Sequence, residues 1–112
     1  MERGPKHIRR LVREYAAIAH DRELSEALRR LGAEFDRWER KELSPHDLND
    51  AIHTFHQGLA RDIWAKYSTT HLEPAVGFAV ATEILRKDEV PDELLQHLAG
   101  WIDFYEHDTS DS

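Results

Sequence analysis

Apolar side chains recur at three- and four-residue intervals along nearly the whole chain, and no segment alternates between apolar and polar positions for long. This spacing is that of a helix buried on one side, whereas a half-buried strand alternates with a period of two. The stripes predict helices over residues 6–19, 22–41, 45–66, 74–86 and 91–106. We therefore expect an all-α protein, a compact bundle of four to five helices in a single domain spanning residues 1–112.

The boundary between the first two predicted helices is placed where the apolar stripe shifts to another side of the helix. If the stripe that begins at Ile8 continued, it would place Arg22 and Glu26 inward, and a new apolar stripe begins instead at Leu24. Charged side chains are rarely buried without partners. We expect a break or kink at His20–Asp21; one long helix that changes the face it buries is the alternative.

The third predicted helix, residues 45–66, has the clearest start of the five. Ser44 can cap it, Pro45 suits its first position, and the Asp47 carboxylate can reach back to the cap. A second apolar band accompanies its main stripe, so we expect a central helix that touches neighbours on two sides. Asp62 falls inside the stripe, and because an unpaired buried carboxylate is costly, we expect it to have an Arg partner.

Residues 75–81 carry no charge, which predicts a helix buried nearly all round. The small residues Gly77, Ala79 and Ala81 would let a neighbouring backbone approach closely. The polar tail after the last predicted helix, residues 107–112, is expected to fray.

The composition of the chain excludes several classes of protein. The 112 residues include 15 Lys or Arg, 22 Asp or Glu and eight His, for a net charge of −7 with His neutral. A general nucleic-acid binder needs surplus basic residues to displace counterions from phosphates, so nucleic acid is not an expected partner. The absence of Cys excludes disulfides, zinc fingers and thiol catalysis. No stretch has the roughly 20 apolar residues of a membrane span and no secretory signal is present, so we expect a cytoplasmic protein.

The charge is unevenly distributed. Five basic residues and one acidic residue give residues 1–13 a net charge of +4, whereas eight acidic and no basic residues follow Lys87. Opposite charges can pair within a fold or between subunits. We expect Arg9, Arg10 and Arg13 to pair with an acidic surface, of which the last predicted helix is the nearest.

A three-residue spacing separates Asp50, His53 and His56, which places them on one helix surface. Imidazole and carboxylate ligands suit zinc, iron or manganese. A metal site would need a further ligand from another helix, and the candidates are Glu34, His71 and His97. The alternative is a polar–aromatic seam, shared with Trp64 and Tyr67, that packs against another helix.

Arg13 is followed, after six residues, by His20. The pair resembles the Arg-x(4–6)-His signature of HEPN ribonucleases, which are all-helical, similar in size and dimeric. The resemblance implies that Arg13 would stabilise the developing charge on a scissile phosphate while His20 moves a proton.

Three His-Asp doublets, one of them His46-Asp47, resemble the ligand pair of HD phosphohydrolases. The resemblance implies a metal held by His20, His46 and Asp47, with a distant carboxylate as the fourth ligand. The candidates for that carboxylate are Asp88, Asp92 and Asp103.

Gly-rich phosphate loops, nucleophile elbows and His-Glu-x-x-His zinc motifs do not occur in the chain. We therefore expect a small helical interaction protein without a cofactor, which forms a homo-oligomer such as a dimer or binds another protein. The expected contact residues are Arg9, Arg10, Arg13, Trp64, Tyr67, Phe78 and Trp101. The alternative is an enzyme: a His-dependent phosphoester hydrolase with a divalent metal such as zinc or manganese, or a HEPN-like ribonuclease that uses Arg13 and His20.

Overall fold

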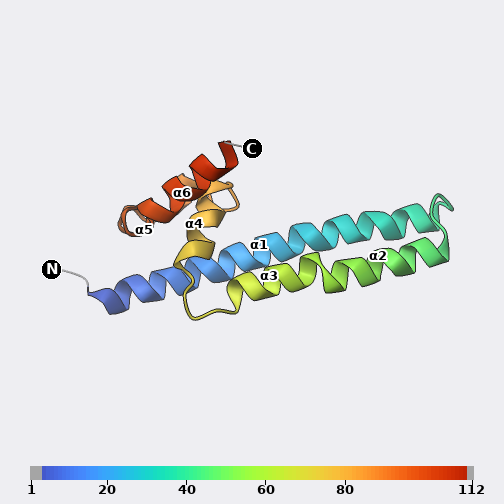
Figure 1. The fold of residues 1–112 in the computed structure, drawn as a ribbon, viewed down its shortest axis with the longest axis horizontal. Coiled ribbons are helices and arrows are strands. Elements are labelled where there is room, and N and C mark those ends of the chain that lie inside the picture. The colour runs from blue at the N-terminus through green and yellow to red at the C-terminus, as the bar shows by residue number, and fades with distance from the viewer. Residues whose placement is uncertain (1–3, 111–112) are drawn as a thin grey trace.

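A computed structural model describes residues 4–110, with the side chains of residues 4–108. The described chain contains no strand, and its packed helices confirm the prediction of an all-α helical bundle (Figure 1). The elements are α1 (Pro5–Glu39), α2 (Pro45–Gln57), α3 (Leu59–Tyr67), α4 (Glu73–Ala81), the 3₁₀ turn η1 (Lys87–Glu89), α5 (Asp92–His97) and α6 (Ala99–Ser110).

The first two predicted helices form one continuous helix, α1, of 35 residues. The predicted break at His20–Asp21 is therefore wrong, and the alternative of one long helix that changes its buried face holds. The reason is that different elements cover the two halves of α1. Its first half packs against α4 and α5, while α2 and α3 lie along the rest. The apolar side chains of the two halves consequently lie on different sides of the same helix.

Helix α1 ends in a tight turn in which a lysine takes the position that glycine usually occupies. Lys41 takes the left-handed conformation, with a φ of 64°. The N–H groups of Lys41 and Glu42 donate to the carbonyl oxygens of Trp38 and Arg37, at 3.0 and 2.8 Å. This pair of bonds is a Schellman motif, which satisfies carbonyl groups at the end of a helix. Ser44 then caps α2 as predicted, by accepting the Asp47 N–H at 3.0 Å.

The predicted third helix is divided at Gly58 into α2 and α3. Gly58 has a φ of −104° and a ψ of −92°, far from helical values. The break rotates α3 relative to α2, so Asp62 is exposed in the first turn of α3 rather than buried. No ion pair between Asp62 and an Arg is found in the described part of the chain, so the expected partner is wrong; a solvated carboxylate in the first turn of a helix needs none.

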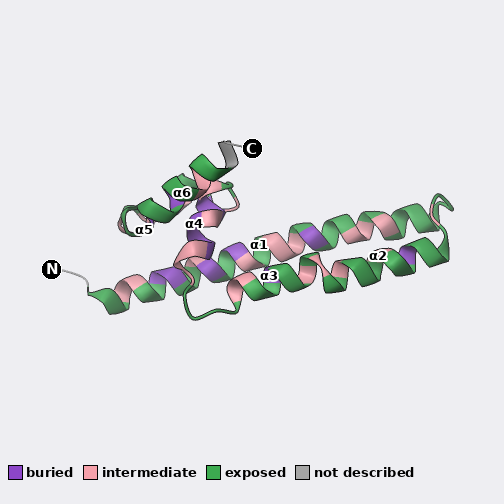
Figure 2. Cartoon of the chain, viewed as in Figure 1, coloured by how far each residue is buried: buried purple, intermediate pink, exposed green. Residues whose placement is uncertain are grey.

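The buried core lies where the first half of α1 meets the C-terminal segment, residues 73–110, which we name the core module. Helix α4 is buried nearly all round, as predicted (Figure 2). None of the buried residues of this core comes from α2 or α3, although Tyr67 of α3 packs against it. Its buried members are Leu11, Val12, Ala16, Ala19, Val76, Ala79, Val80, Leu85, Val90, Leu94, Leu98 and Ile102.

The core module is more divided than its sequence predicts. The helix expected over residues 74–86 ends at Ala81, and Glu83 then has a φ of 64°. The helix expected over residues 91–106 is two helices, α5 and α6, which meet at Leu98. Helix α6 continues to Ser110, so most of the tail expected to fray is helical, while residues 111–112 lie outside the described part.

Beyond the core, α1 and α2 form a two-helix arm that extends away from the core module (Figure 1). We define the arm as residues 24–59, which include the connection between the two helices. The molecule measures 61 × 30 × 22 Å, and its radius of gyration of 17.4 Å exceeds the about 13 Å of a spherical domain of this length. Only Ala27 and Leu48 are buried within the arm. The arm is therefore a pair of helices whose apolar seam is covered on one side only.

Candidate interaction surface

The predicted basic contact residues lie on α1, near its start. Arg9, Arg10 and Arg13 are all exposed. Arg10 contacts neighbours on its own helix, with its guanidinium 3.0 Å from His7 Nδ1 and 3.6 Å from Glu14 Oε1. The acidic C-terminal end reaches α1 elsewhere, through Glu93 Oε1, which lies 3.0 Å from His7 Nε2. The three arginines are thus left facing solvent rather than the last helix.

The four predicted aromatic contacts divide into two kinds. Trp64 and Trp101 are exposed, with Trp64 64% accessible. Tyr67 and Phe78 instead join the elements: the Tyr67 ring stacks on His20 with centroids 5.0 Å apart, and Lys66 Nζ lies 4.1 Å above the Phe78 ring. The tryptophans are accessible to a partner, whereas Tyr67 and Phe78 serve internal packing.

His20 and Arg13 share one side of α1, about two turns apart, because seven residues correspond to nearly two full turns. His20 is half-buried against Tyr67, whose hydroxyl lies 3.3 Å from the Glu23 carboxylate. Burial, together with the negative charge of Glu23, raises the pKa of the Tyr67 hydroxyl above its usual range. Tyr67 therefore acts as a hydrogen-bond donor to Glu23, and His20 is held in a packed stack.

The residues considered as metal ligands are not gathered into a site. The described side chains include no cluster of three or more His, Asp or Glu placed to hold a metal ion. Asp50, His53 and His56 are exposed along α2. The pair His46-Asp47 lies where α2 begins, at the tip of the arm and far from the acidic residues of η1, α5 and α6 (Figure 1).

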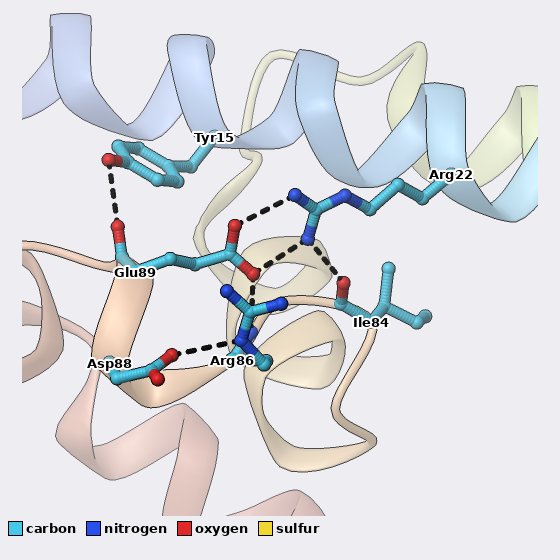
Figure 3. Close-up of polar contacts among 6 residues, drawn as sticks. All are labelled: Tyr15, Arg22, Ile84, Arg86, Asp88 and Glu89. Atoms are coloured by element: carbon cyan, nitrogen blue, oxygen red, sulfur yellow. Dashed lines mark hydrogen bonds and ion pairs between the residues drawn. The ribbon is translucent and has the colours of Figure 1, made fainter.

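The strongest polar contact joins α1 to the core module (Figure 3). Arg22 donates two hydrogen bonds of 2.7 Å to the two oxygens of Glu89, and its Nη1 also donates to the Ile84 carbonyl at 2.9 Å. Tyr15 Oη donates to the Glu89 carbonyl at 3.1 Å. The Arg86 N–H donates to the Glu89 carboxylate at 2.8 Å. This cluster fixes the loop before α5 on α1, and the periodicity of the sequence gave no indication of it.

The carboxylate of Glu89 makes the attachment of the core module sensitive to acid. Its hydrogen bonds to Arg22 and to the Arg86 backbone lower the pKa of Glu89 to about 2. A carboxylate with a lowered pKa contributes stability above its unfolded value and loses it as the pH falls through the folded value. We expect the midpoint temperature of unfolding to decrease as the pH is lowered from about 4.5 to 2. The decrease should be smaller in Glu89→Gln.

The matched control for this pH experiment is Glu83→Gln, which changes an exposed carboxylate of the same loop. Circular dichroism at pH 7, 4.5 and 2.5 gives the three midpoints for each protein. The control should show the pH dependence of the unmodified chain. A pH dependence in Glu89→Gln equal to that of the unmodified chain would contradict the role of this carboxylate.

Two faces of the arm differ in shape. On one side, small residues leave a groove of about 510 Å³ along the seam between α1 and α2. The groove meets a hollow of about 580 Å³ at α4, and Ala27, Arg30 and Leu59 line both. The cations around this hollow already have carboxylate partners, since Arg22 pairs with Glu89 and Lys66 with Glu23. The hollow therefore offers little uncompensated positive charge to an anionic ligand.

The opposite side of the arm carries protruding apolar side chains. Leu28, Phe35 and Ile52 are 49%, 40% and 37% exposed, and we name this set the apolar face. Helical register places Leu28 and Phe35 within about 20° of each other on α1. The apolar stripes of the helices predicted over residues 22–41 and 45–66 include these three side chains and predict their burial, but they lie at the edge of the helix pair, where α1 and α2 do not cover them.

No family of proteins, no curated protein and no solved structure matches this chain. In the described residues, no helix combines the length and the apolar character needed to cross a bilayer.

Proposed function

We propose that this protein is a small helical interaction protein that self-associates through its arm. The observation that supports this function is the exposure of large apolar side chains along the arm, which includes the apolar face and Trp38 at its tip. Contiguous apolar surface on a soluble protein is typical of an interaction site. The arm extends beyond the core, and no other described element covers its apolar face, so we propose that a partner does.

The accessible surface of the chain supports the same proposal. The chain exposes 7998 Å². A monomer of 13.1 kDa is expected to expose about 6,400 Å², so the excess is about 1,600 Å². A standard protein interface removes about 800 Å² from each partner. The excess surface of one chain is therefore larger than its share of such an interface.

Two copies of the arm can cover the apolar side chains that a single arm leaves exposed. A pair of helices can cover its apolar side chains on the seam only, whereas four helices enclose a common core. Isologous pairing uses the same patch on both subunits and closes after two copies. Self-association of two arms as a four-helix bundle thus covers the apolar face and leaves the core modules free at the periphery.

The substitution Phe35→Glu tests this function. It places a charge on the apolar face, and we expect it to weaken the dimer by at least about tenfold, as loss of an aromatic contact within an interface does. Sedimentation equilibrium over a range of concentrations measures the association constant. The matched control is Ala33→Glu, because Ala33 is exposed on the other side of α1 and its change should leave association intact.

Two results would overturn the proposal. One is an unmodified chain that sediments as a monomer at every concentration. The other is a Phe35→Glu protein that keeps the association constant of the unmodified chain while circular dichroism shows the same helix content.

A further inference from the structure

We infer that the partner of the apolar face is a second copy of this chain, packed antiparallel along α1 with a two-fold axis at Gly32. This inference rests on the proposed self-association and specifies its geometry. It follows from three features of α1: a notch at Gly32, bulky apolar residues on both sides of the notch, and charges on one flank of this face that can pair across the axis.

The notch is a property of Gly32 in the folded chain. A Cβ atom added there would meet nothing within 4 Å, so the surface above this glycine is open. At about 100° per residue, Gly32 lies about 40° from Leu28 and about 60° from Phe35 around α1. The lack of a side chain at this point lets the backbone of a second helix approach closely.

The apolar residues are arranged almost symmetrically about the notch. Leu28 precedes Gly32 by four residues and Phe35 follows it by three. In an antiparallel pair centred on Gly32, residues whose numbers sum to about 64 face each other. Leu28 of one copy therefore packs beside Phe35 of the other, and the two-fold axis repeats the contact. Each bulky side chain covers the one that its own monomer leaves exposed.

The charges on the flank of this face select the antiparallel arrangement. Arg29 precedes Gly32 by three residues and Asp36 follows it by four, and register places both about 90° from Leu28 on the same flank. The antiparallel pair brings Arg29 of each copy to Asp36 of the other, whereas a parallel two-fold pair would place the two flanks on opposite sides of the interface and leave these charges without a partner across it. Charge complementarity across the contact therefore favours the antiparallel arrangement. Among the described residues, the ion-pair partner of Arg29 is the exposed Glu26, at 3.5 Å.

The core modules are compatible with this geometry. Each module packs on the first half of α1, around Ala16, which lies 16 residues before Gly32. That separation corresponds to about 24 Å along the helix. Antiparallel packing about Gly32 therefore places the two modules on opposite sides of the axis, about 48 Å apart along the helices. The arms overlap while the modules do not meet.

Cysteine cross-linking tests the position of the axis, because the chain has no Cys of its own. We expect Gly32→Cys to form a covalent dimer on mild oxidation or with a short bis-maleimide, since the two residues meet at the axis. The control is Arg37→Cys, at an exposed position on the other side of α1, which should remain uncross-linked. A third variant, Thr54→Cys, reports on the groove between α1 and α2.

A charge exchange supplies an independent measurement. Arg29→Asp should weaken the dimer in sedimentation equilibrium, because it places two carboxylates at each flank contact. Adding Asp36→Arg to the same chain restores opposite charges across the axis and should restore association. Recovery in the double variant is not expected if either residue acts only within its own helix.

The outcomes separate the inference from the function on which it rests. A monomeric unmodified chain overturns both. A dimer in which Thr54→Cys cross-links and Gly32→Cys does not overturns the antiparallel axis, assigns the groove as the contact, and leaves self-association standing. Cross-linking at Gly32 together with recovery by charge exchange supports the inference.

Discussion

Replacement of Leu94 by Ala is expected to lower the free energy of unfolding by about 2–5 kcal/mol. Leu94 is fully buried and belongs to the core between the first half of α1 and the core module. The loss combines the transfer free energy of the removed atoms with the cavity that they leave. A domain of this size is stable by only about 5–15 kcal/mol, so this one truncation removes a large fraction of the total.

Urea unfolding followed by far-UV circular dichroism measures this effect. The matched control is Ile18→Ala, which shortens an aliphatic side chain that is 38% exposed on α1. Ile18→Ala is expected to lower the free energy of unfolding by about 1 kcal/mol, because less apolar surface returns to water. Equal losses for the two variants would show that the stability of the chain is not concentrated in this core.

Replacement of Gly77 by Ala is expected to destabilise the chain by about 1–3 kcal/mol. The added Cβ would lie 2.5 Å from the Cβ of Trp101 and 3.3 Å from its carbonyl carbon, so α4 and α6 must separate. The close approach predicted from the small residues of α4 is thus confirmed, with α6 as the neighbour. The destabilisation occurs although Ala is the better helix former by about 1 kcal/mol.

Gly100→Ala is the matched control, and its effect should have the opposite sign. Gly100 lies in α6, one residue before Trp101, and a Cβ there would meet nothing within 4 Å. Without a clash, the higher helix propensity of Ala should stabilise the chain by up to about 1 kcal/mol. Two variants that change stability in the same direction would contradict close packing of α4 on α6.

The Arg22–Glu89 contact illustrates what sequence periodicity misses. The apolar stripe that begins at Ile8 would place Arg22 inward, and this charged position predicts that the first helix ends beside it. The structure keeps the helix intact and places the guanidinium on a carboxylate and a carbonyl of the core module. These partners are 62 and 67 residues away in the chain. The spacing of residues within α1 carries no information about a partner at that distance. The sequence of α1 alone therefore does not predict the Arg22–Glu89 contact.

The helical class, the cap at Ser44 and the charge-free helix α4 follow from the sequence alone, because each depends on neighbouring residues within one or two turns. The continuity of α1, the division of α2 from α3 at Gly58, and the position of Leu28, Phe35 and Ile52 at the edge of a helix pair depend on tertiary packing. The physical reason is that a stripe of apolar residues shows which side of a helix avoids water, whereas the number and position of neighbours decide how much of that side is covered. In this chain the neighbours cover the first half of α1 and leave the arm exposed.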